Sequence, residues 1–116
     1  MRLKTAVLAC LLWSVVASAE QVTTYDIAHV RHRDRDMVFV VVNRNFFAQS
    51  NATQERWWTA LKVCVRDADL RGTTIAVADV RGRFRFYGPK SWHDFLRTLD
   101  MDWVNARINK ELTCHY

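Results

Sequence analysis

Arginines and aromatic residues alternate in the stretch RGRFRFYG, Arg81–Gly88. Side chains two residues apart share one face of a strand, so this pattern would place Arg83, Arg85 and Tyr87 together. A guanidinium group binds carboxylate or phosphate through two parallel hydrogen bonds, and tyrosine is a rigid contact residue in interfaces. The stretch therefore predicts a binding strand with these three residues as the first candidate contacts. The alternative is a plain solvated face over an apolar core.

A second group of candidate contact residues is aromatic. Trp57 and Trp58 are adjacent, and two adjacent residues of one helix cannot both point at the core. One of them is expected at the margin, exposed or over the loop that carries Phe46 and Phe47. An exposed cluster of aromatic and arginine side chains is typical of a protein-binding patch, which makes Trp57 and Phe47 the second candidates. The alternative is that tryptophan-rich packing compensates for a small core.

Histidine and acidic residues gather in the stretch HVRHRDRD, His29–Asp36. Two ligands on one strand share a face only when they are an even number of residues apart, and His29 and His32 are three apart. The segment therefore predicts a charged hairpin tip rather than a metal site. No metal ion and no other cofactor is expected.

Ser91, His93 and Asp94 are the residue types of a hydrolytic triad. Neighbours on one helical turn do not align as nucleophile, base and orienting acid, and Ser91 suits a helix cap. The sequence also contains no GxSxG or HExxH motif. The protein is therefore not expected to be an enzyme. The alternative function is a small secreted hydrolase or lyase that uses His93 or His29 as general base.

The first 19 residues have the features of a cleaved secretory signal peptide. Arg2 and Lys4 form a short basic region, an apolar run follows, and Ala17–Ala19 gives the small-residue pattern that predicts cleavage before Glu20. The apolar run is about a dozen residues long, too short to span a bilayer comfortably. We expect residues 20–116 to form one exported bacterial domain, periplasmic or secreted, without an integral membrane segment.

Loss of the leader would remove Cys10 and leave two cysteines, Cys64 and Cys114. An even pair of cysteines in a small exported chain predicts a disulfide. A disulfide that closes this loop of about 50 residues would stabilise the fold by roughly 4 kcal/mol. That is a large share of the ~5–15 kcal/mol free energy of unfolding of a small domain. The alternative is two free thiols or one catalytic thiol.

The chain without its leader is moderately basic. Removing Arg2 and Lys4 leaves 15 basic against 12 acidic residues, a net charge of about +3. This balance fits attraction to an acidic surface and falls short of the dense positive stripe of nucleic-acid binders. We therefore expect a non-enzymatic binding domain. Its partner is expected to be a protein or an acidic component of the cell envelope, and not a nucleic acid.

Apolar periodicity predicts the elements that would position these residues. Four strands are expected, at Val22–Val30, Met37–Val42, Thr73–Val80 and Arg83–Tyr87. The strand Met37–Val42 is apolar on both sides, which is typical of a strand covered on both faces. In the last two strands, a turn at Arg81–Gly82 would place Val80 opposite Arg83, Ala78 opposite Arg85 and Ala76 opposite Tyr87.

Three helices are predicted from helical spacing and capping residues. The first begins after Thr53 and stops at Gly72, the second begins after Ser91, and the third begins after Asp100 or Asp102 and ends near Cys114. The order ββ-α-ββ-αα predicts an α+β fold, a small two-layer sandwich. A mostly antiparallel sheet of about four strands would be packed by two to three helices. The disulfide would then join the C-terminal helix to the helix of Cys64.

Overall fold

The structure is a computed structural model that describes residues 21–116. The predicted leader and its cleavage site before Glu20 lie outside the described residues. In chain order, the elements are β1 (Val22–His32), β2 (Arg35–Val41), the 3-10 helix η1 (Arg44–Ala48), α2 (Asn51–Asp67), β3 (Thr73–Val80), β4 (Arg83–Tyr87), the 3-10 helix η2 (Lys90–Trp92), α3 (His93–Leu96), α4 (Met101–Asn105) and β5 (Lys110–His115). Within residues 21–116, no helix is long and apolar enough to cross a membrane.

The strands form one five-stranded sheet in the order β4-β3-β2-β1-β5. β2 and β3 are parallel and are connected through α2, while the other three pairings are antiparallel. The α+β class is therefore confirmed, but the sheet is mixed and has five strands rather than four. The parallel pair follows from the connection, because a crossing helix returns the chain to the same end of the sheet.

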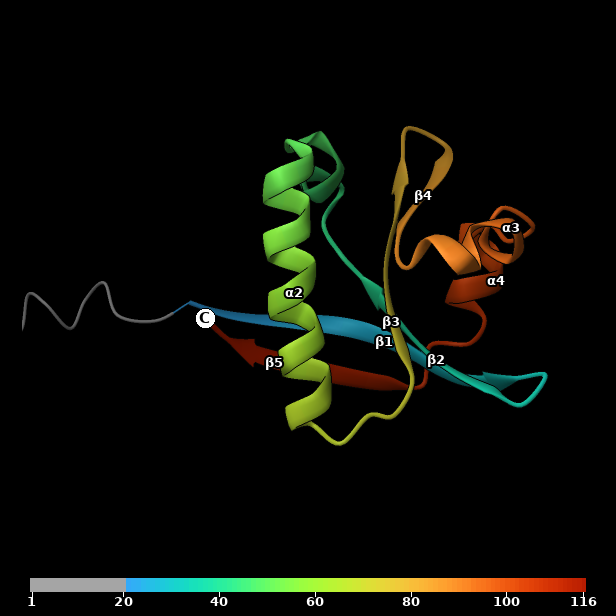
Figure 1. Cartoon of the computed structure of the whole chain (residues 1–116), viewed down its shortest axis with the longest axis horizontal. Helices are drawn as coiled ribbons and strands as arrows, with labels where there is room; N and C mark the ends of the chain where they lie inside the picture. The colour runs from blue at the N-terminus through green and yellow to red at the C-terminus, as the bar shows by residue number, and fades with distance from the viewer. Residues whose placement is uncertain (1–20) are drawn as a thin grey trace, which may run out of the picture.

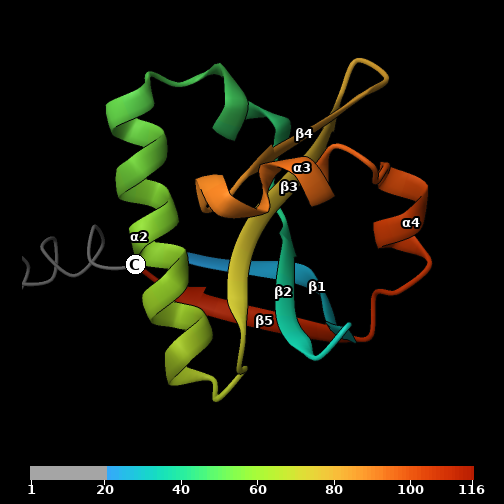
Figure 2. The same ribbon diagram turned by 45° about the vertical axis from the view of Figure 1, so that its right-hand side comes forward.

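Helices cover both faces of the sheet, so the fold has three layers rather than the expected two (Figure 1). Side chains alternate along β2: Val38 and Val40 pack with the α2 face, whereas Met37 and Phe39 pack with Leu96 on the α3–α4 face. The four β2 residues are fully buried, which confirms a strand covered on both sides. Figure 2 shows α2 and α4 on opposite sides of the strands.

The predicted C-terminal helix is wrong. The helix α4 ends at Asn105, and the chain then forms the edge strand β5, which pairs with β1. Buried Leu112 and Cys114 flank exposed Thr113, so this segment follows the two-residue period of a strand. The apparent helical stripe combined two elements, because Val104 packs on the α3–α4 face and Leu112 on the α2 face.

A disulfide joins Cys64 to Cys114, as predicted, with Cα atoms 5.9 Å apart. Because Cys114 lies on β5, the bond ties α2 to an edge strand and not to a second helix. A disulfide is compatible with an oxidising extracellular compartment.

The helix α2 begins earlier than the sequence predicts. Ser50 is its N-cap, and the Ser50 Oγ accepts a hydrogen bond of 3.2 Å from the Thr53 N–H. Thr53 thus lies within the first turn rather than at the cap. Because α2 already begins at Asn51, it follows η1 almost directly. This places Glu55 and Trp57 near the end of β4.

Candidate binding site

The strand β4 presents Arg85 and Tyr87 on the α2 face of the sheet. The predicted register is confirmed, with Ala78 opposite Arg85 and Ala76 opposite Tyr87. Ala76 and Ala78 are 0% and 2% exposed, however, and belong to the core under η1 and α2. This face is therefore not the open outer surface that the alternation suggested, and only its edge on β4 reaches solvent.

Aromatic rings from three elements meet beside Tyr87, in what we call the aromatic–arginine cluster: Phe46 and Phe47 of η1, Trp57 and Trp58 of α2, and Arg85 and Tyr87 of β4. The Phe46 ring is the centre, with centroids 5.0 Å from Phe47, 5.9 Å from Trp57 and 5.8 Å from Tyr87. Such tilted ring pairs are stabilising beyond their burial. The cluster therefore holds its members in one fixed arrangement.

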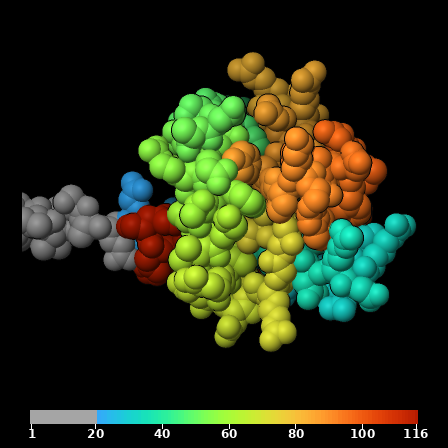
Figure 3. All heavy atoms as spheres, in the orientation of Figure 1, coloured from blue at the N-terminus to red at the C-terminus, as the bar shows by residue number. Residues whose placement is uncertain are grey.

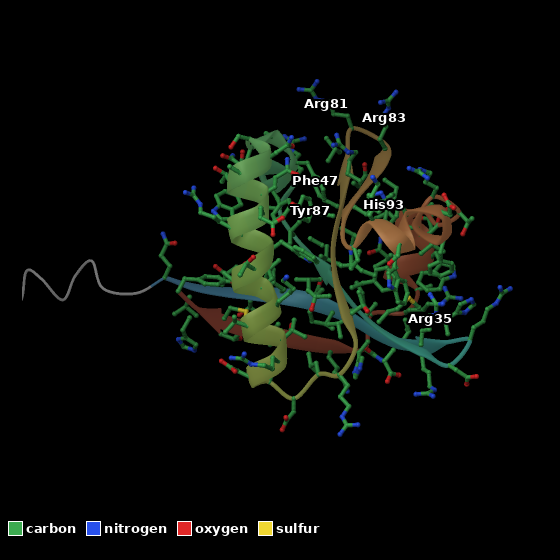
Figure 4. The ribbon with its side chains drawn as sticks, viewed as in Figure 1. Arg35, Phe47, Arg81, Arg83, Tyr87 and His93 are labelled. Atoms are coloured by element: carbon green, nitrogen blue, oxygen red, sulfur yellow. A yellow bond between two sulfur atoms is a disulfide. The ribbon has the colours of Figure 1, made fainter. Side chains whose placement is uncertain are left out.

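Four of the five sequence-predicted contact residues, Arg85, Tyr87, Trp57 and Phe47, fall within this cluster. The fifth, Arg83, lies at the β3–β4 hairpin tip. Figure 4 shows Arg81 and Arg83 projecting from that tip, with Phe47 and Tyr87 between α2 and β4. The tip itself protrudes from the body of the molecule in Figure 3.

The two-residue turn at this tip has positive φ at both central residues, as tight hairpin turns commonly do. Arg81 has φ of 57°, in the left-handed region, and Gly82 follows with φ of 83°. The carboxylate of Asp79 accepts a 2.7 Å hydrogen bond from the Gly82 N–H and so closes the turn. Asparagine or glycine would fit the first position with less strain. Arg81 therefore adopts a backbone conformation that carries a local energetic cost.

The two adjacent tryptophans have different roles. The Trp58 indole N–H donates to the Thr74 carbonyl at 3.0 Å, and the ammonium of Lys62 lies 3.7 Å from the Trp58 ring centroid. Trp57 is 40% exposed and makes its ring contact with Phe46. Trp57 is therefore the more exposed tryptophan of the pair.

The candidate residues also differ in how much surface they offer. Phe47 is only 9% exposed, and its ring lies 5.3 Å from the exposed guanidinium of Arg85. Phe47 therefore packs beneath Arg85, and the guanidinium is the part that reaches solvent. A cation above an aromatic face gains a modest attraction that orients it.

Glu55 is a member of the site that the sequence reasoning missed. The Tyr87 hydroxyl donates a 2.7 Å hydrogen bond to Glu55 Oε1 across the gap between β4 and α2. Burial and this interaction with Glu55 raise the pKa of Tyr87 above its usual value. The only available signal was that Glu55 lies two residues before Trp57 in the first part of the helix.

The histidines that the enzymatic alternative requires are each held by local contacts. His29 Nε2 lies 2.8 Å from the Arg71 carbonyl, and His93 Nε2 lies 3.3 Å from the Gly88 carbonyl. The His32 ring stacks on Phe95 at 5.2 Å. In the part of the chain that the structure describes, no group of three or more histidine, cysteine or acidic residues is arranged to hold a metal ion.

Comparisons with protein-family models, with curated proteins and with solved structures give no match to this chain.

Proposed function

We propose that this protein is an exported, non-enzymatic domain that binds an acidic segment of a partner protein. The contact surface is the exposed edge of the aromatic–arginine cluster together with the β3–β4 hairpin tip. Three features support the proposal: the exposed ring of Trp57, the Arg85 guanidinium oriented over Phe47, and the projecting Arg83. An acidic component of the cell envelope is the other partner class, and the experiment below distinguishes the two.

One observation supports the proposal most strongly. The packing of η1, α2 and β4 places the large exposed ring of Trp57 and the exposed guanidinium of Arg85 at one edge of the molecule. Arg85 makes no ion pair with an acidic residue of the described chain, whereas Arg31, Arg66 and Arg97 do. Arginine and tryptophan are the residue types that most often dominate binding energy in protein interfaces. The cluster thus combines a charge without an internal carboxylate and a rigid apolar surface.

The test is capture of envelope proteins by the purified exported domain, compared with the Arg83→Ala/Arg85→Ala variant. The Arg31→Ala/Arg33→Ala variant is the matched control, because it removes two arginines from the other hairpin. We expect the first variant to recover at least about tenfold less of a specific protein, and the control to recover nearly as much as wild type. Recovery should also decrease moderately as salt is raised.

Two results would count against the proposal. Equal recovery of every partner by the two variants would remove the cluster as the binding site. Binding to vesicles that contain anionic lipid, with the same dependence on Arg83 and Arg85 and no captured protein, would assign the site to an envelope component instead.

A further inference from the structure

Strand β1 has different neighbours along its two halves. β5 pairs with it over Val22–Ile27, whereas β2 pairs with it only over Ile27–His32. After Val41 the chain diverges from β1 toward η1, and Figure 1 shows the two paths separating. Among residues 21–116, no strand lies beside the first residues of β1 on the β2 side.

The hydrogen bonds to β5 establish which backbone groups of β1 point which way. Gln21 and Tyr116 exchange both backbone hydrogen bonds, at 3.1 and 2.8 Å. Farther along, the Ile27 carbonyl accepts from the Asn109 N–H at 2.9 Å. Bonded and non-bonded pairs alternate in an antiparallel ladder, so the odd-numbered residues of β1 direct their backbone groups toward β5.

The even-numbered residues Val22 and Thr24 therefore direct their backbone N–H and C=O groups away from β5, into the space beyond the end of β2. The Thr24 hydroxyl forms a 2.9 Å hydrogen bond with the Thr113 hydroxyl, and this bond does not involve the backbone groups of Thr24. An unpaired row of this kind is a template for another strand. Proline or lysine, which commonly protect such edges, is absent from Val22–Tyr25.

A pocket of about 810 Å³ lies beside the free edge of β1 at Thr24, and Val22 lies just outside its lining. Phe46, Trp57 and Leu61 give it an apolar wall, and Asn43 and Asn45 line the side where the chain leaves β2. Trp57 and Tyr116, which also line it, are 40% and 43% exposed. Unpaired backbone groups, an apolar wall and open space thus occur together.

We propose that this pocket binds an extended segment of another polypeptide, which adds to β1 as a strand beside Val22 and Thr24. The backbone of the segment pairs with these two residues, and its alternate side chains, which are apolar, contact Trp57 and Leu61. Strand addition of this type obtains affinity from backbone hydrogen bonds and specificity from pockets for alternate side chains.

The recessed position of the edge favours a flexible segment over a second copy of the domain. The residues Asn43, Asn45 and Phe46 lie on one side of the free edge, and Trp57 and Leu61 of α2 line the same pocket. In a second copy, the same edge is recessed to the same depth. Two recessed edges cannot approach to the roughly 4.8 Å spacing of paired strands, whereas a single extended chain can enter.

The probe is a capped heptapeptide of alternating valine and threonine with a lysine at each end, whose charge disfavours the arginine site. The matched control peptide has the same side chains and N-methylated inner amides. The protein variants are Thr24→Pro, which removes the N–H that faces the pocket, and Thr24→Val, which keeps it. Because the Thr24 N–H does not pair with β5, the proline substitution leaves that ladder intact.

Binding is followed by NMR and by amide hydrogen exchange. We expect millimolar peptide to slow exchange of the Val22 and Thr24 amides at least about tenfold, with binding weakened about tenfold by N-methylation and by Thr24→Pro. Thr24→Val and Arg83→Ala/Arg85→Ala should bind as wild type, which separates this site from the proposed arginine site. Equal binding of the N-methylated peptide, or no binding at several times this concentration, would overturn the proposal. Protection that appears without peptide and is lost on dilution would instead assign the edge to a second copy.

Discussion

The two faces of the sheet are covered in different ways. On one face, the 17-residue helix α2 packs over the core and is joined covalently to β5 through Cys64 and Cys114. On the other face, two short helices, α3 and α4, pack through Leu96 and Val104 without a disulfide to the sheet. The long helix α2 covers its face of the sheet and still leaves apolar side chains exposed to solvent, whereas the apolar side chains of α3 and α4 pack against the other face.

Exposed apolar surface is concentrated on the α2 side. Among the described residues, four large hydrophobic side chains remain exposed, and three of them lie on the α2 side: Trp57 and Val63 of α2, and Tyr116, which follows Leu112 and Cys114 at a spacing of two. The fourth, Val22, lies six residues before Ala28 of the α3–α4 core and therefore points to the other face of β1. On the α3–α4 face, the rings of Phe39 and Trp103 pack edge to face at 5.5 Å. This concentration of exposed apolar surface supports our proposal that the α2 side binds the partner, while the α3–α4 side supports the fold.

The largest expected effect is loss of the disulfide. The Cys64→Ala/Cys114→Ala variant should lose roughly 4 kcal/mol, which lowers the melting temperature by roughly 15–30 °C. Thermal unfolding followed by circular dichroism measures this change. A decrease below about 5 °C would show that α2 is held by packing alone and would remove the difference between the faces.

A truncation on the other face should come next. Leu96 is fully buried, and Leu96→Ala should destabilise the domain by about 3 kcal/mol through lost burial and a cavity. Urea denaturation measures the loss, and partner capture at a temperature where the variant is folded should equal that of wild type. A loss of capture by this folded variant would contradict the division between the faces.

A smaller effect is expected at the start of α2. Ser50→Ala removes the cap that accepts the Thr53 N–H and should cost about 1 kcal/mol of stability. Ser50→Asp, which preserves a capping oxygen, is the matched control and should remain near wild type. If both variants lose stability equally, the cap is not the reason that α2 begins at this position.

The smallest expected effect is a dependence on alkaline pH. Burial and the hydrogen bond to Glu55 raise the pKa of Tyr87 in the folded protein above its unfolded value of about 10. The folded state then retains its proton to higher pH, so this stabilisation is complete below pH ~10 and is lost as pH rises through the folded pKa.

The pH effect is measured by the free energy of unfolding between about pH 8 and pH 11 for wild type and Tyr87→Phe. Stability should decrease more steeply with pH in wild type than in the variant. Tyr116, whose pKa is also raised by burial and by Tyr25, is present in both proteins and cancels in the difference. Parallel curves would show that the contact between Tyr87 and Glu55 does not perturb the titration.

The sequence predicted the features that depend on local alternation and on cysteine chemistry. The β3–β4 register was predicted from the alternation of side chains along the two strands. The disulfide was predicted because two cysteines remain once the leader is removed. Pairing between β2 and β3 depends on contacts distant in the chain and left no local signal. The edge strand β5 was missed because Trp103, Val104, Ile108 and Leu112 fit a helical spacing although they belong to different elements.

The candidate site was predictable in composition but not in its surroundings. Alternation placed Arg85 and Tyr87 on one face, and the Trp57–Trp58 pair implied that one ring lies at the margin. The burial of Ala76 and Ala78 under η1 and α2 depends on tertiary packing, as does the bond from Tyr87 to Glu55. Such contacts join residues about 30 positions apart, beyond the reach of any local pattern.

The most direct test of the proposed binding site is a footprint of the captured partner on the domain, measured by amide hydrogen exchange. We expect slower exchange in β4, at the β3–β4 hairpin tip and in the first half of α2 around Trp57. Exchange in the β1–β2 tip around Arg33 and in the α3–α4 segment should remain unchanged. A footprint on the α3–α4 face, with no protection around Arg85 and Trp57, would show that the partner binds elsewhere than the aromatic–arginine cluster.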